Sequence, residues 1–79
     1  MNEILKGDDK DTTFTVKVVC GLLNVRKGPG TNYGVVSVIR KGSTHKVTDT
    51  EGTVGKSGSW GKIGTNQWIS LNEKYAKKV

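Results

Sequence analysis

Residues that commonly build active sites and cross-links are scarce in this 79-residue chain. A single cysteine, Cys20, excludes an internal disulfide and any metal site that needs several cysteines. A single histidine, His45, lacks partners with the identity and spacing of a zinc site. Cys20 ends a predicted strand and no neighbouring charge favours a thiolate, so a buried structural thiol is expected rather than a Cys–His nucleophile. The sequence predicts no catalytic residue, no metal and no cofactor.

Long apolar runs are missing as well. No stretch approaches the roughly 20 apolar residues that cross a bilayer. The first residues, Met1 to Lys6, lack the basic segment and apolar run of a signal peptide. The length allows one domain with a thin core, since only 33% of the residues are hydrophobic. We therefore expect a small domain with no membrane partner.

Acidic residues are few and are concentrated at the start of the chain. Four of the seven lie within the first 11 residues, and residues 1–12 are predicted to form a linker or flexible tail before a domain at residues 13–79. From Phe14 onward, eleven basic residues face three acidic ones, a net charge of +8. A basic body favours a polyanionic partner. Nucleic acid, anionic lipid and anionic wall polymers all satisfy this condition, and charge does not choose among them.

Helical periodicity is missing, and short alternating segments take its place. Strands are expected at residues 14–20, 22–26, 35–39, 44–50, 60–63 and 67–71. A glycine- and serine-rich flexible hairpin loop is expected at 51–59, and at most one helical turn at 73–77. The pattern predicts an all-β fold, a small antiparallel β-barrel of five to seven short strands.

The stretch from Leu23 to Tyr33 is the most informative part of the chain. It starts as a strand and breaks at Gly28-Pro29-Gly30, where we predict a type II turn with positive φ at Gly30. The small polar, amide and aromatic residues that follow suit a recognition loop. An ordinary β-turn with an exposed tyrosine is the alternative.

Candidate binding residues gather on and around this stretch. Asn24 and Arg26 share the strand face opposite Leu23 and Val25. Arg26 suits either a ligand carboxylate or phosphate, or the carbonyls of its own loop, and the two roles carry equal weight. Trp60 suits a ligand or the rim of the core equally. The predicted ligand-binding residues are Asn24, Arg26, Thr31, Asn32, Tyr33, Trp60 and Trp68, of which Tyr33 is the strongest candidate, while core packing is favoured for Trp68.

The motif Leu-Asn-Val-Arg-x-Gly-Pro-Gly-x-x-Tyr at residues 23–33 resembles the signature of the bacterial SH3-like (SH3b) cell-wall-binding domain. The resemblance spans Phe14 to Leu71 and continues through Lys41-Gly42, Trp60-Gly61-Lys62-Ile63 and Trp68-Ile69. The loop at 51–59 is longer than the family leads us to expect. The resemblance implies an SH3-like β-barrel that binds peptidoglycan and has no catalytic activity.

Such modules commonly lie at the C-terminus of phage endolysins and bacterial autolysins. The resemblance therefore implies a chain made in the host cytoplasm that targets a parent lytic enzyme, whose catalytic part is not in this sequence, to the Gram-positive cell wall. Anionic wall polymers are a further expected partner.

Two other hypotheses remain open. A nucleic-acid-binding small barrel ranks lower, because the basic residues are dispersed and no RNA-binding signature occurs. The second hypothesis is that the chain is a separate binding subunit, which assembles around the full-length enzyme as a homo- or hetero-oligomer. The candidate contact residues for this assembly are Val35, Val38 and the Ile4-Leu5 pair.

Overall fold

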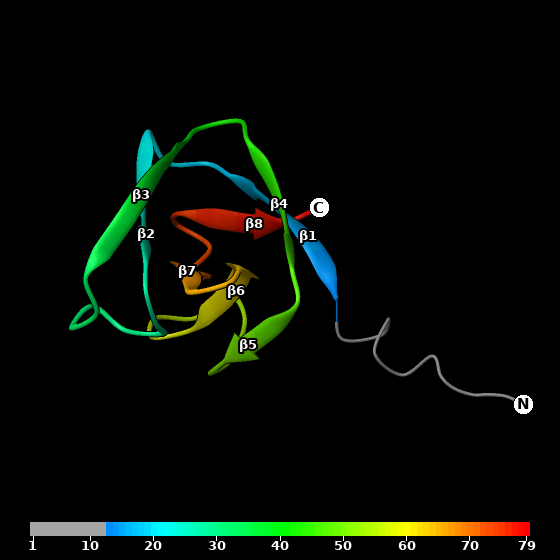
Figure 1. Ribbon diagram of the computed structural model, residues 1–79. Helices are drawn as coiled ribbons and strands as arrows, with labels where there is room; N and C mark the ends of the chain where they lie inside the picture. Colours follow the sequence, from blue (N-terminus) through cyan, green and yellow to red (C-terminus); the bar gives the residue numbers. More distant parts are fainter. Residues whose placement is uncertain (1–12) are drawn as a thin grey trace, which may run out of the picture.

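The computed structural model describes residues 13–79 and shows an all-β fold (Figure 1). The predicted tail at 1–12, with the Ile4-Leu5 pair, lies outside the described residues. The strands are β1 (Phe14–Val18), β2 (Leu22–Arg26), β3 (Val35–Arg40), β4 (Thr44–Val47), β5 (Asp49–Glu51), β6 (Trp60–Gly64), β7 (Gln67–Ser70) and β8 (Ala76–Lys78). Residues 13–79 contain no helix long and apolar enough to cross a membrane.

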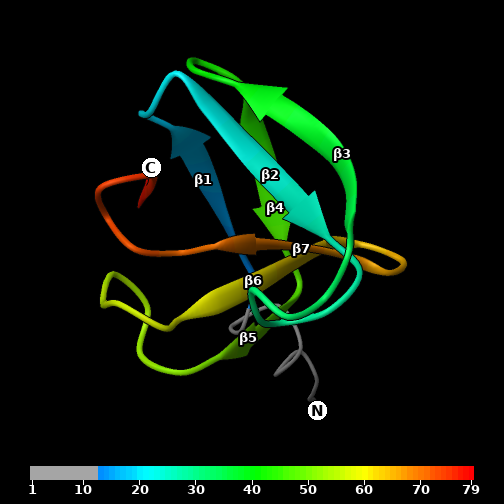
Figure 2. The same ribbon diagram turned by 90° about the vertical axis from the view of Figure 1, so that its left-hand side faces the viewer.

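Two antiparallel sheets make up the barrel. Three strands form one sheet in the order β4-β1-β8, and five form the other in the order β3-β2-β7-β6-β5. The chain passes between the sheets at four points: residues 19–21 between β1 and β2, residues 41–43 between β3 and β4, Thr48 between β4 and β5, and residues 71–75 between β7 and β8. Figures 1 and 2 show β1 and β4 across the barrel from β2. The expected small SH3-like β-barrel is confirmed.

The core fills the space between the sheets. Alternation along β1 and β2 directs Val16, Val18, Leu23 and Val25 inward, as the sequence predicts. Val47, Ile69, Leu71 and Ala76 complete this buried set. Phe14, Cys20, Ile39 and Ile63 pack against it while partly exposed. With so few fully buried side chains, each carries a large share of the stability.

The structure has eight strands in residues 13–79, more than the five to seven expected. The strand predicted at 44–50 divides at Thr48, whose backbone N–H donates to the Lys62 carbonyl at 2.9 Å. The sequence allows at most one helical turn at 73–77, and a single turn precedes β8, where the Tyr75 and Ala76 N–H groups both donate to the Asn72 carbonyl, at 2.8 and 3.1 Å. Ala76 is buried in the core and the tail pairs with β1, because sheet pairing satisfies backbone groups that one isolated helical turn would leave open.

The glycine-rich segment between β5 and β6 is attached to the barrel. The Gly55 N–H donates to the Leu71 carbonyl at 3.0 Å, and the Leu71 N–H donates to the Ser59 carbonyl at 2.9 Å. Ser59 is fully buried, with its Oγ donating to the Lys56 carbonyl at 2.7 Å. These contacts place the segment beside the start of β6.

Candidate functional site

The outer face of the five-stranded sheet carries the predicted binding residues of the strands. Directly paired residues in antiparallel strands share a face. Trp60 of β6 pairs with Ser70 of β7, and Arg26 of β2 pairs with Trp68 of β7. Because Ile69 points into the core, its neighbours in β7 point outward.

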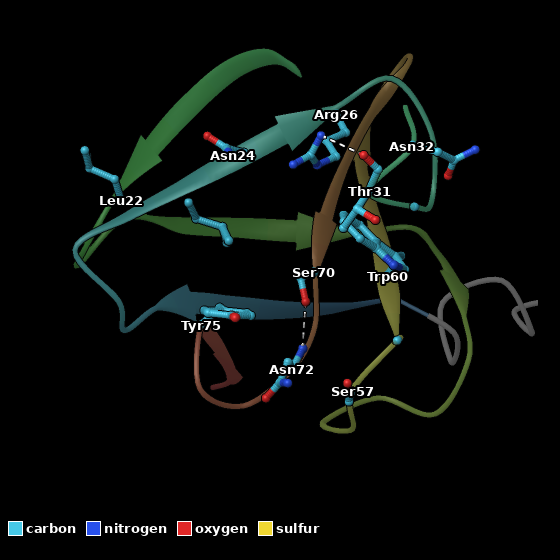
Figure 3. Close-up of a pocket in the computed structure, with 13 residues that line it drawn as sticks. Leu22, Asn24, Arg26, Thr31, Asn32, Ser57, Trp60, Ser70, Asn72 and Tyr75 are labelled. Atoms are coloured by element: carbon cyan, nitrogen blue, oxygen red, sulfur yellow. Dashed lines mark hydrogen bonds between the residues drawn. The ribbon is translucent and has the colours of Figure 1, made fainter. Parts of the chain in front are cut away.

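A hollow of about 650 Å³ lies over this face (Figure 3). It is lined by Leu22, Leu23, Asn24, Arg26, Gly30, Thr31, Asn32, Ser57, Gly58, Trp60, Ser70, Asn72 and Tyr75. In Figure 3, Arg26, Thr31 and Trp60 lie toward one end and Tyr75 toward the other. The structure therefore brings five of the seven predicted residues to one hollow, and leaves out Tyr33 and Trp68.

The loop between β2 and β3 forms one wall of the hollow. The Gly30 N–H donates to the Gly28 carbonyl at 2.9 Å, which closes a three-residue turn around Pro29. The prediction of a type II turn with positive φ at Gly30 is wrong, since Gly30 is absent from the positive-φ glycines of residues 13–79. A three-residue turn of this kind suits the fixed φ of proline and needs no left-handed residue.

Arg26 holds this loop in place. Its Nη1 donates to the Thr31 carbonyl at 3.1 Å and to the Tyr33 carbonyl at 2.9 Å. The structure thus shows the loop-holding role that the sequence left open. Within residues 13–79, the other guanidinium nitrogens have no hydrogen-bond partner. Arg26 lines the hollow, so these nitrogens are available to a ligand carboxylate or phosphate as well.

Tyr33 supports the loop from the side. A β-carbon on Gly28 would overlap the Tyr33 ring, and one on Gly30 would meet Asn32 Oδ1 at 2.6 Å. Gly28 is therefore required for space beneath the Tyr33 ring, whereas a β-carbon at Gly30 would need only a rotation of the exposed Asn32 amide. Tyr33 is 43% exposed but does not line the hollow, so a ligand contact by this ring stays a prediction.

The two tryptophans of the outer face have different surroundings. Trp60 is partly buried and lines the hollow. Trp68 is also partly buried but lies outside the hollow and outside the core cluster, so the expected core packing is wrong. Strand alternation gives the core position to Ile69, and Trp68 takes the outer face opposite Lys62 and Arg26.

The side chains around the hollow are mostly polar and available. Among the described residues, the amides of Asn24 and Asn32, the hydroxyl of Thr31 and the indole N–H of Trp60 have no hydrogen-bond partner. Arg26 is the one charged residue of the lining. This combination suits a polar ligand with amide and carboxylate groups that places an apolar surface on Trp60.

Sequence reasoning missed part of the lining. Ser57, Gly58 and Ser70 carry no signal of their own, and Tyr75 lies in the C-terminal tail, where the sequence gives it no place in the fold. Asn72 Oδ1 accepts from the Lys74 N–H at 3.0 Å, and its own N–H donates to Ser70 Oγ at 3.3 Å. These bonds position the turn that carries Tyr75. Only the Asx-turn chemistry of Asn72 is a recognisable sequence signal.

The potential nucleophile pair is not assembled. Cys20 lies beyond β1, which ends at Val18 rather than at Cys20 as predicted, and it is half-buried, with Sγ donating to the Leu22 carbonyl at 3.3 Å. His45 Nε2 lies 3.1 Å from Ser43 Oγ. Within residues 13–79, no three His, Cys, Asp or Glu residues gather where a metal could be held.

Comparison with known proteins gives one result. A family model described as bacterial SH3 domain matches residues 21–75, which is more than half of the chain and spans β2 to β7 together with the turn that carries Tyr75. No curated protein and no solved structure gives a significant match. Such domains are generally non-catalytic binding modules, and this membership is consistent with binding to cell-wall components. The chain belongs to the bacterial SH3 domain family.

Proposed function

We propose that the hollow over β2, β6 and β7 binds a short extended peptide of bacterial peptidoglycan. The observation that carries the proposal is the set of unpartnered polar groups around Trp60, with Arg26 as the one charge. The amide of Asn24 offers both a donor and an acceptor to a peptide backbone, and the free nitrogens of Arg26 suit a peptide carboxylate. Family membership supports the same ligand class.

The module then serves as an anchor. A parent lytic enzyme, an endolysin or an autolysin of Gram-positive walls, is the partner we propose for it, with the chemistry carried elsewhere. The domain raises the concentration of the enzyme at its substrate, and so adds effective affinity without new contacts at the catalytic centre.

Sedimentation with isolated cell walls tests the proposal. We expect the chain to pellet with peptidoglycan from which anionic polymers have been extracted, and Trp60→Ala to stay largely in the supernatant. Trp68→Ala is the matched control, because Trp68 is also a half-buried tryptophan of the same sheet face but lies outside the hollow. Equal loss by both variants would place the ligand across the whole sheet face. No pelleting with any wall type would refute the proposal.

A further inference from the structure

The three-stranded sheet β4-β1-β8 carries a group of lysines that have no ion pair with the described residues and that the proposed peptide site does not use. Register places Lys17 of β1 directly opposite Lys77 of β8, and Thr15 directly opposite Lys46 of β4. Because directly paired residues share a face and residues two apart on a strand do too, all three lysines point to the same side. The three lysines are exposed, and we call this surface the lysine face.

The spacing of these charges follows from the ladder. The Val79 N–H donates to the Thr15 carbonyl and the Val19 N–H to the Tyr75 carbonyl, so Lys17 and Lys77 form a pair of the hydrogen-bonded type. Their Cα atoms are then about 5.5 Å apart. Lys46 is a diagonal neighbour of Lys17, at about 7–8 Å.

No acidic group offsets these charges. Strands β1, β4 and β8 contain no Asp or Glu. Lys17, Lys46 and Lys77 have no ion pair with any of the residues that the structure describes. Lys78, the next residue along β8, places its Nζ over the Phe14 ring at 4.8 Å and so belongs to a different surface. Like charges directly opposite each other destabilise a sheet, and a bound polyanion would remove this repulsion.

We propose that the lysine face binds a chain of repeated phosphodiesters, an anionic polyol-phosphate polymer of the bacterial wall. Lysine ammonium groups suit the point charges of successive phosphates, whereas paired planar carboxylates favour arginine, which this face lacks. The neighbouring face positions are threonines, Thr15 and Thr44, which offer hydroxyl donors. Within β1, β4 and β8 no aromatic residue shares this face, and Tyr75, two residues before Lys77, lines the hollow instead, which argues against stacking of single-stranded nucleic acid on the lysine face.

The two sites share no residue, and Tyr75 of the hollow lies two residues before Lys77 of the lysine face. The hollow lies on the sheet of β2, β6 and β7, and the lysine face lies on β4, β1 and β8, with β1 and β4 on the opposite side of the barrel from β2 (Figures 1 and 2). One molecule can therefore hold a peptide and an anionic polymer of the same wall at once. This inference rests on the proposed function in one respect, because it assumes that the anionic polymer comes from the bacterial wall.

Binding of purified poly(glycerol phosphate) to the full chain tests the lysine face. Each lysine at an anionic surface contributes about fivefold in affinity, so Lys17→Gln with Lys77→Gln should weaken binding about 30-fold at low salt. The matched control, Lys27→Gln with Lys56→Gln, removes two exposed lysines from elsewhere and should change affinity less than about twofold. The logarithm of affinity should fall against the logarithm of salt concentration with a slope of about −2 for three contacts.

Three results would overturn the inference. The first is unchanged affinity in the Lys17/Lys77 variant, and the second is an equal loss in the control variant. The third is binding of oligothymidylate as tight as that of the polymer, which would assign the face to nucleic acid. Trp60→Ala should leave polymer binding intact while reducing sedimentation with polymer-free walls, so a failure of the peptide site and a failure of the lysine face give different results.

Discussion

Replacing Arg26 separates its two roles, holding the loop and contacting a ligand. Nη1 donates to two carbonyls of the loop. A hydrogen bond to a charged group contributes about 1.5–3 kcal/mol. One nitrogen serves both carbonyls near solvent, so we take about 1.5 kcal/mol for the pair, at the lower end of that range. In a domain of this size, each kcal/mol lowers Tm by about 4–8 °C, so Arg26→Ala should melt about 6–12 °C lower.

Thermal unfolding followed by circular dichroism measures this loss, and wall sedimentation well below Tm measures binding. Arg26→Ala should lose both stability and binding, because Thr31 and Asn32 then leave the wall of the hollow. Arg26→Lys keeps the positive charge but lacks the planar guanidinium, so its Tm and its binding should lie between those of the unmodified chain and those of Arg26→Ala. Lys27→Ala is the control, since it removes a neighbouring exposed charge. A Tm within about 2 °C of the unmodified chain, together with lost binding, would refute the loop-holding role and leave Arg26 as a ligand contact alone.

The remaining predictions concern packing and assembly. Gly61→Ala should cost about 1–3 kcal/mol and lower the denaturant midpoint, because the new β-carbon would meet the Leu71 side chain at 2.9 Å; an unchanged midpoint would contradict the tight packing there. Gly28→Ala should displace the Tyr33 ring and alter the near-ultraviolet circular dichroism of the tyrosine, whereas an unaltered spectrum would mean that the ring does not cover this glycine. Val38 is 48% exposed on β3, an edge strand, so Val38→Lys should change stability by less than about 0.5 kcal/mol. If copies assemble through that edge, light scattering should show a lower mass for this variant, and equal masses would remove the edge as the contact.

The edge strand β3 shows which structural features the local sequence pattern predicts and which it does not. The sequence predicts a strand at residues 35–39, and β3 spans Val35–Arg40. Its three valines are nevertheless exposed, and only Ile39 packs against the core. The exposure of these valines has two causes: a register shift opposite Val25 and Arg26, and the position of β3 at the end of the sheet. Neither cause can be read from the local alternation of residues.

Local sequence pattern is enough to predict the all-β class, the inward faces of β1 and β2, and the position of the loop after Arg26. These features depend on strand periodicity and turn chemistry within a few residues. Three features become visible only in the folded chain: Trp60 lines the hollow while Trp68 does not, Tyr33 packs on Gly28, and Lys17 lies opposite Lys77. Each of these depends on sheet order and register between segments distant in the chain, which the closure of the barrel sets and no local pattern records.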